Sequence, residues 1–258
     1  MIPEMELREK ARENGVPLST VERDYAQNWL LKHLSVIEMA LKGGTGIRKV
    51  YVESYRFSDD LDFTLLRKMD KKKIEEEILE GIKRVREESG INFEENLQLK
   101  ENVNGYEGIV RFRITRRTGD PMRIKLDITK NERKKILLPL EEKEIIHPYS
   151  DECNAKVISY SLEEIVAEKI RSLFERTRPR DLYDVWKLWD RIDSEKVMKI
   201  LPEKCKFKEV KIDKNALQER KDDFKNAWET SLRHQLKEVP DFTQVFGEIL
   251  IIIESIIS

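Results

Sequence analysis

Apolar and polar residues alternate along residues 57–65, which predicts a β-strand with one buried and one polar face. Asp60 and Asp62 both fall on the polar face of this strand, together with Ser58. Two carboxylates that lie side by side repel each other unless a cation lies between them, and a hard divalent ion with oxygen ligands suits such a pair. The pattern therefore favours a site for Mg²⁺ or Mn²⁺ at Asp60 and Asp62.

A glycine turn precedes this strand. Residues 39–41 are typical of a short buried strand, Gly43 and Gly44 of a turn, and Thr45 of the N-cap of a helix that runs to Lys49. Backbone N–H groups at the start of a helix bind phosphate readily. A turn and an Asp-x-Asp pair are each common without any function, so their order and spacing carry the interpretation.

A hairpin follows later in the chain, with strands over residues 108–116 and 122–129 joined through residues 118–121. Period-two alternation places Asp127 on the polar face of the second strand. Asp127 is therefore a candidate third carboxylate. The alternative is an ion pair of Asp127 with Arg111 or Arg113, because the surrounding polar face is basic.

Helical spacing of apolar residues predicts three helices in the first ninety residues, over 5–13, 19–34 and 70–89. Ser19 and Glu22 have the spacing of a capping box at the start of the second helix. Gly90 ends the third, and residues 91–100 predict a weak strand.

The second half of the chain is mainly helical. After a charged connector over 131–158 and a short strand over 156–160, Ser161 and Glu164 predict a capping box for a helix from Leu162 to Glu175. Lys169 falls on the apolar stripe of this helix. Its aliphatic stem could pack there while the ammonium group reaches water, or the charge could have a partner or ligand.

Charged residues gather just after this helix. Asp181 and Asp184 lie in the first turn of a helix that follows Pro179, where the helix dipole favours acids whatever their role. The densest local group of basic residues is a predicted surface for an RNA backbone or a nucleotide, unless it is only solvated. It comprises Arg171, Arg176, Arg178 and Arg180. The apolar residues that follow, Val185, Trp186, Leu188 and Trp189, are expected in the core.

We expect an α/β (α+β) protein of two lobes, residues 1–150 and 151–258. The 258 residues suffice for two cores, and 49 basic against 50 acidic residues give a net charge of −1, so any nucleic-acid contact must be local. Cys153 and Cys205 lack the spacing of a zinc site or a disulfide framework, which favours a reducing cytoplasm. No signal peptide is expected, and the apolar tail from Leu250 is too short to span a membrane.

Three stretches of the chain resemble the AbiEii/AbiGii-type toxins, a branch of the polymerase-beta-like nucleotidyltransferases. They are Lys42-Gly43-Gly44-Thr45 with Arg48-Lys49, then Arg56-Phe57-Ser58-Asp59-Asp60-Leu61-Asp62-Phe63, then residues 167–171 with 178–184. Thr45 stands where the wider superfamily more often has serine. The resemblance covers roughly residues 19 to 190, and it implies a small mixed sheet flanked by helices, a helical C-terminal lobe, and an active site in the cleft between the lobes.

The resemblance also implies roles for residues. Asp60 and Asp62 would hold metal ions, and Gly43, Gly44, Thr45 and Ser58 would line the nucleotide site. Asp127 would be a further metal ligand or base. Lys169 would neutralise the triphosphate, while Asp184, with Asp181 close behind, would supply an acid to the active site.

The implied reaction transfers a nucleoside monophosphate from a nucleoside triphosphate to a hydroxyl group. For this toxin family the implied acceptor is the 3′ end of tRNA, in a toxin–antitoxin or abortive-infection system whose antitoxin is a DNA-binding regulator or a kinase-like protein. The alternatives are transfer to a protein or a small molecule, or an inactive nucleotide-binding module. Residues 194–258 carry no recognisable chemistry and could recognise the acceptor or the antitoxin.

Overall fold

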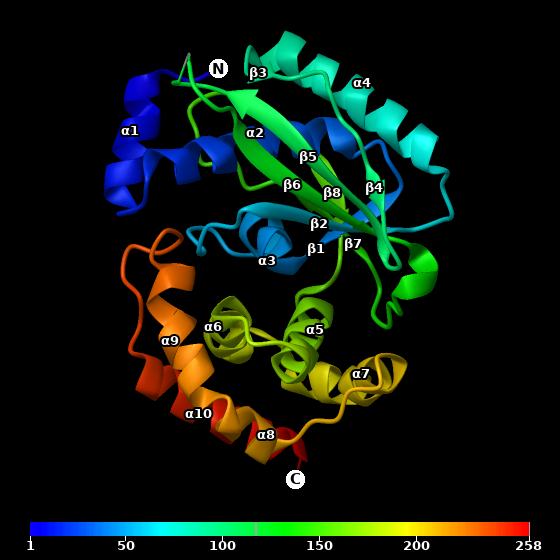
Figure 1. The fold of residues 1–258 in the computed structure, drawn as a ribbon, viewed down its shortest axis with the longest axis vertical. Coiled ribbons are helices and arrows are strands. Elements are labelled where there is room, and N and C mark those ends of the chain that lie inside the picture. The colour runs from blue at the N-terminus through cyan, green and yellow to red at the C-terminus, as the bar shows by residue number, and fades with distance from the viewer. Residues whose placement is uncertain (117, 258) are drawn as a thin grey trace. The chain divides into compact units, whose positions relative to one another are not determined.

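The chain folds into two compact units in a computed structural model that describes residues 1–116 and 118–257 (Figure 1). The first unit comprises residues 1–134 and 140–160, and the second comprises 135–139 and 161–258. The division thus falls ten residues later than the expected position after residue 150. The reason is that β8 (Lys156–Ser159) pairs with β1 (Met39–Lys42) and so belongs to the sheet of the first unit.

The first unit is built on one mixed sheet. Its strands follow the order β3-β5-β6-β2-β1-β8-β7, and β4 also pairs with β5. The remaining strands are β2 (Asp60–Leu65), β3 (Asn92–Phe93), β4 (Lys100–Glu101), β5 (Gly105–Arg113), β6 (Met122–Thr129) and β7 (Glu141–Glu144). β2 runs parallel to β6 and β1 parallel to β8, while the other pairings are antiparallel. The expected mixed sheet and the 108–129 hairpin are therefore confirmed, the first hairpin strand starting at Gly105.

The prediction of a single weak strand over residues 91–100 is wrong. β3 and β4 are two residues each, and they pair with opposite ends of β5. Between them the chain turns Leu97 and Leu99 into the core, where both pack over the open position of Gly108; a Cβ there would lie 2.7 Å from Leu99 Cδ2. Packing of these two leucines replaces the hydrogen-bonded ladder.

Helices of the first unit include α1 (Glu4–Glu13), α2 (Leu18–Leu34) and α4 (Lys71–Ser89). α2 packs against α4, β6 and β8 (Figure 1). The capping box expected at Ser19 is wrong, because α2 starts one residue earlier, after Pro17, and Ser19 lies inside it. The buried carboxylate of Glu22 instead accepts a hydrogen bond from the backbone N–H of Thr115 at 2.9 Å.

Asp24 anchors α2 to the segment after β1. That segment is helical as α3 (Gly43–Gly46) and the π-helical turn η1 (Ile47–Tyr51). The buried carboxylate of Asp24 lies 2.6 Å from Arg48 Nε and 2.6 Å from Lys49 Nζ, and it accepts a hydrogen bond from the Tyr149 hydroxyl at 2.7 Å. Burial raises the pKa of Asp24, but Arg48 and Lys49 outweigh it and hold that pKa below its usual range. Burial lowers the pKa of Lys49 to about 8.

The second unit is helical. It contains α5 (Leu162–Glu175), α6 (Pro179–Leu188), α7 (Ser194–Phe207), α8 (Lys214–Glu219), α9 (Lys221–Leu232) and α10 (Phe242–Ile257), with 3-10 turns η2 (Asn131–Arg133) in the first unit and η3 (Trp189–Arg191) here. α5 packs on α6 and α7, and α6 packs on α9 and α10. Val185 and Leu188 lie in the core as expected, whereas Trp186 and Trp189 are half-buried. Trp186 stays near the surface because its Nε1 donates to Glu248 at 2.6 Å.

The predicted capping box of α5 forms only in half. Ser161 Oγ accepts from the N–H of Glu164 at 3.2 Å, as expected. The buried Glu164 carboxylate does not reach back, because it accepts from the N–H groups of Leu137 and Leu138 at 3.1 and 2.9 Å and pairs with Lys204. These bonds tie residues 135–139 to the second unit.

Two further expectations concern cysteines and the apolar tail. Cys153 and Cys205 are free and buried, and burial raises the pKa of Cys153 to about 12. α10 buries one face, including Phe246 and Ile253. Among the described residues, no helix combines the length and the apolar character that crossing a membrane requires.

Candidate active site

Asp62 and Asp127 stand side by side on the sheet. In the parallel register of β2 and β6, Asp62 lies opposite Asp127, and on the other flank of β2, Lys42 of β1 lies opposite Asp62. Partners in register point to the same face of a sheet. Lys42, Asp62 and Asp127 therefore form one row across three strands, with both aspartates half-buried and the lysine buried.

The neighbourhood of Asp127 penalises its charge. Burial first, and then the nearby Asp62 carboxylate, raise the pKa of Asp127 above its usual value, against a smaller opposing effect of Lys42. The alternative ion pair with Arg111 does not fit the register. Glu107 lies opposite Asp127, and Arg111 lies four residues further along β5, about 13 Å away at the rise of a strand.

Asp60 lies two residues before Asp62 on the same face of β2, opposite Lys125. Throughout residues 1–116 and 118–257, no three acidic, histidine or cysteine side chains already form a metal site. The donor set at Asp62 and Asp127 still fits a hard divalent cation, since two adjacent carboxylates, one of them with a raised pKa, gain from a positive charge between them.

The glycine turn lies close to Asp62 of this acid pair. Gly43 has a φ of +69°, and a Cβ at this position would lie 2.5 Å from Asp62 Oδ2. A Cβ on Gly44 would lie 2.6 Å from Arg56 Nη2 and 3.2 Å from Ser58 Oγ. The glycines therefore bring backbone close to Asp62, Ser58 and Arg56 where side chains would not fit.

Thr45 is not the N-cap that the sequence predicts. The helical segment begins at Gly43, with Lys42 in the capping position and no side-chain cap. Thr45 lies within the first turn, and its Oγ1 donates to the backbone carbonyl of Asp60. The chain leaves β1 at Gly43, whose φ is positive, and the threonine fixes α3 to the strand that carries the aspartates.

Three residues near the site were not identified from sequence. Arg56, 3% exposed, donates to the carbonyl of Phe57 at 3.1 Å beside Gly44. Gln27 Nε2 of α2 donates to the carbonyl of Ser58 at 3.0 Å. Lys42 donates to Thr129 Oγ1 at 2.9 Å. Arg56 and Lys42 lie inside the stretches that carry the resemblance, which was the available signal, whereas only the fold brings Gln27 to Ser58.

Replacement of Gly43 by alanine is expected to reduce both activity and stability. The positive φ alone costs about 1–2 kcal/mol for an alanine, and the added Cβ would displace the Asp62 carboxylate. Gly90 offers a matched control, because its φ is +71° and a Cβ added there would meet nothing within 4 Å. Gly90→Ala should lose similar stability in urea unfolding but keep nucleotidyl transfer. Equal transfer by the two variants would contradict a role for the close approach.

Lys169 of the second unit belongs to a buried ion cluster. Its Nζ lies 2.7 Å from Asp181 Oδ1 and 2.8 Å from Asp184 Oδ2, and Arg176 Nε lies 3.0 Å from Asp181 Oδ2. The side chains of Asp181 and Asp184 are 2% and 0% exposed, and that of Lys169 is 12% exposed. Its charge is thus held by two acids, so snorkelling to water is not the reason for its place on the apolar stripe.

The four arginines do not share one exposed surface, whether for an RNA backbone, for a nucleotide or for solvent alone. Arg171 is buried, pairs with Glu175 at 3.4 Å, and its Nε has no hydrogen-bond partner within the described residues. Arg176 pairs with Asp181 at 3.0 Å, Arg178 is exposed, and Arg180 is half-buried. Arg171 is buried because α5 packs against α6 and α7.

Comparisons with known proteins identify the class of fold. The nucleotidyltransferase toxin MenT4 from Mycobacterium tuberculosis H37Rv is similar to this chain with a TM-score of 0.72 and 19% identity, covering 100% of this chain and 90% of MenT4. JHP933 from Helicobacter pylori gives a TM-score of 0.58 and 18% identity over 93% of each chain. The fold is therefore that of nucleotidyltransferase toxins. A search of the curated proteins finds no match to this chain.

Residues 29–250 match the family described as nucleotidyl transferase AbiEii toxin, Type IV TA system. The chain belongs to this family, and it is a nucleotidyltransferase toxin of a type IV toxin–antitoxin system. The match includes both the Asp62–Asp127 pair and the Lys169 cluster.

Proposed function

We propose that this protein transfers a nucleoside monophosphate from a nucleoside triphosphate to the 3′ end of tRNA, with release of pyrophosphate. The observation that carries the proposal is the glycine turn held against Asp62, with Asp127 beside it. Helix N-termini favour phosphate, and paired carboxylates favour a divalent cation, so the two features suit the two parts of a metal-bound triphosphate. The family supports a triphosphate substrate.

In this proposal Asp60, Asp62 and Asp127 hold Mg²⁺ or Mn²⁺. When bound, the metal would neutralise charge on the attacking and leaving oxygens. The backbone of Gly43, Gly44 and Thr45 would bind phosphate oxygens. The hydroxyl of Ser58 would line the same site, since it lies against Gly44.

The proposal gives Lys169 the role of a positive charge that stabilises the triphosphate. Asp181 and Asp184, which contact it directly, would then orient the lysine rather than take part as free carboxylates. Both acids remain necessary for activity in this proposal. Asp184 would act through Lys169.

The test is incubation of the purified protein with total tRNA, Mg²⁺ and each labelled nucleoside triphosphate in turn, beside an Asp60→Ala variant. Labelled tRNA with the wild-type protein only would support the proposal and identify the nucleotide. Labelled protein or small molecule in place of RNA would redirect the acceptor. Turnover unchanged by Asp60→Ala would overturn the proposed site.

The family also implies a cognate antitoxin. We propose that the antitoxin is a separate protein and that the toxin acts in the cytoplasm. Growth arrest on expression of the wild-type chain, absent with Asp60→Ala and relieved by a neighbouring gene product, would support this part of the proposal. Equal arrest by both chains would show that toxicity does not depend on the transfer reaction.

A further inference from the structure

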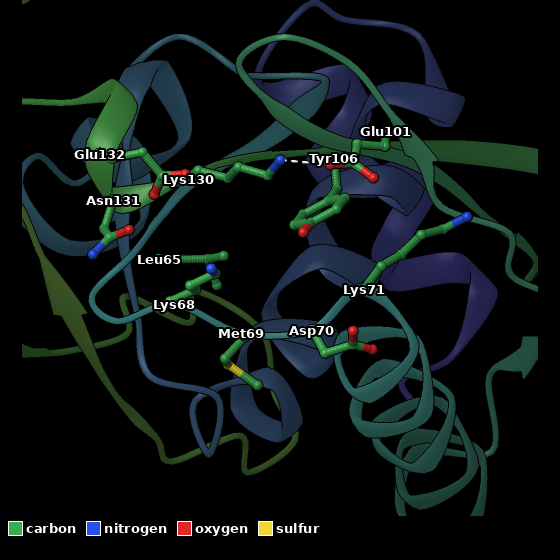
Figure 2. A pocket seen from close by; sticks show the side chains of 10 residues that line it. All are labelled: Leu65, Lys68, Met69, Asp70, Lys71, Glu101, Tyr106, Lys130, Asn131 and Glu132. Carbon is green, nitrogen blue, oxygen red and sulfur yellow. Dashed lines mark hydrogen bonds and ion pairs between the residues drawn. The ribbon is translucent and has the colours of Figure 1, made fainter.

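A hollow of about 430 Å³ opens in the first unit between the end of β2, the start of α4 and the segment that follows β6 (Figure 2). Leu65, Met69 and Tyr106 contribute apolar surface to it, and Lys68, Lys71 and Lys130 lie around it. Its volume is within the roughly 300–1,000 Å³ of small-molecule sites. It is large enough for one nucleotide and too small for a duplex.

This hollow is separate from the Asp62–Asp127 pair. Tyr106 lies opposite Ile128 in the β5–β6 register, and Ile128 is adjacent to Asp127, so Tyr106 and Asp127 project from opposite faces of the sheet. Leu65 follows Asp62 by three residues, about 10 Å along β2. The hollow therefore lies on the other face of the strands that carry the acids, towards one end of them.

Tyr106 contributes both its ring and its hydroxyl to the hollow. The residue is 6% exposed, and burial raises the pKa of its hydroxyl. Figure 2 shows the hydroxyl directed into the hollow, and Lys130 Nζ lies 5.1 Å from the centre of the ring. The hydroxyl is open to the hollow, so a ligand with a polar edge could take the place of water there.

Basic residues are concentrated on two segments beside the hollow. Residues 67–73 carry five basic residues and one acid, and residues 130–134 carry three and one, in a chain whose net charge is −1. Lys68 makes no ion pair among the described residues, and Lys71 Nζ makes a long contact of 3.9 Å with the half-buried Glu75, whereas Lys130 pairs with Glu101 at 2.6 Å. A long contact of this kind is weak, so Lys68 and Lys71 remain available to an anionic ligand.

We infer that this hollow binds one unstacked base of single-stranded RNA while the two basic segments hold the flanking phosphates. The apolar surface suits the face of a base, and the hydroxyl of Tyr106 with the amide of Asn131 suits its edge. An acidic peptide would be served by the lysines alone and would not need the acceptor groups of Asn131 and Glu132. The inference rests on the proposed function, in which RNA is the acceptor.

The test measures binding of a fluorescent single-stranded oligoribonucleotide by anisotropy, with a chelator and without any nucleoside triphosphate. Lys68→Glu with Lys71→Glu is expected to weaken binding at least tenfold and to reduce the slope of log K against log salt by about 1.4, for two phosphates at about 0.7 each. A matched control is Lys83→Glu with Lys156→Glu, which reverses two exposed lysines away from the hollow and should change binding less than twofold.

Tyr106→Phe removes only the hydroxyl and should fold normally. It is expected to weaken binding three- to tenfold with an unchanged salt slope and an unchanged melting temperature. The inference would be overturned if the Lys68→Glu, Lys71→Glu variant bound RNA as tightly as its control variant. It would also be overturned if Tyr106→Phe bound RNA as tightly as the wild type. Equal binding of a duplex would do so too, and effective competition by polyglutamate would assign the surface to an acidic protein.

The binding assay separates two failures. Loss of the inferred RNA site with continued labelling of an acceptor would overturn this inference and leave nucleotidyl transfer intact. RNA binding that follows the expected pattern in a protein that labels no RNA would overturn the proposed acceptor and leave the binding site standing.

Discussion

Asp62→Asn is expected to lower nucleotidyl transfer by about 10³-fold or more, because it removes one of two adjacent charges that would hold the catalytic cation. The substitution preserves shape and relieves the repulsion that raises the pKa of Asp127. The folded state should therefore lose no stability, and unfolding in urea should require the same or a higher urea concentration. Single-turnover labelling of the acceptor measures the first effect.

Asp59→Asn is the matched control for this experiment. Asp59 is also half-buried in the same segment, but its carboxylate pairs with Arg23 at 2.5 Å. Its substitution should leave transfer within a fewfold of wild type. Similar losses in the two variants would mean that the segment as a whole, rather than the Asp62–Asp127 pair, is what activity requires.

Lys169→Met is expected to destabilise the folded chain by about 3–5 kcal/mol, because it leaves Asp184 buried without the ammonium group beside it. Asp181 is less affected, since Arg176 still contacts it. The free energy of unfolding in urea measures this loss. Under the proposed function, transfer activity should also be lost, at a temperature where the variant remains folded.

A second substitution separates stability from activity. Adding Asp184→Asn to Lys169→Met removes the buried negative charge that Lys169 contacts and should restore much of the lost stability. It should restore no activity, because the positive charge proposed for the triphosphate is still absent. Recovery of transfer in the double variant would show that Lys169 serves only to keep Asp184 paired.

At acidic pH, the free energy of unfolding should depend on the protonation of Asp181. Burial raises its pKa, but Lys169 and Arg176 outweigh burial and hold it below 3.8. A lowered folded-state pKa stabilises the protein above the unfolded value and loses that effect as pH falls. The stability difference between wild type and Asp181→Asn should thus be full near pH 6 and shrink below about pH 4. A difference independent of pH would contradict the ion pair.

Local patterns predicted what depends on local geometry. Period-two alternation placed Asp60 and Asp62 on one face of β2, and helical spacing placed Lys169 on a buried stripe. Asp62 and Asp127 are 65 positions apart in sequence, and their adjacency depends on the register between two strands, which alternation does not contain. The acids that contact Lys169 lie in the next helix. The apolar stripe therefore predicted that Lys169 is buried, but it could not predict the partners of Lys169.

The wrong predictions share a physical origin. Ser19 and Thr45 are good N-caps by residue type, but the first helical residue is set by backbone conformation at Pro17 and Gly43. Arg171 belongs to a basic run in the sequence, yet its position on α5 faces the interior. Residue type alone does not fix these outcomes, because the neighbouring backbone and helix packing decide them.

Residues 135–139 belong to the second unit, whereas residues before and after them belong to the first. The polypeptide therefore passes from one unit to the other three times. A fragment that starts at Ser161 would lack the N–H groups that Glu164 binds and the Lys135 carbonyl that Lys204 binds at 2.7 Å. The helical unit is thus an interrupted domain, which cannot be exchanged between homologues as a single contiguous cassette.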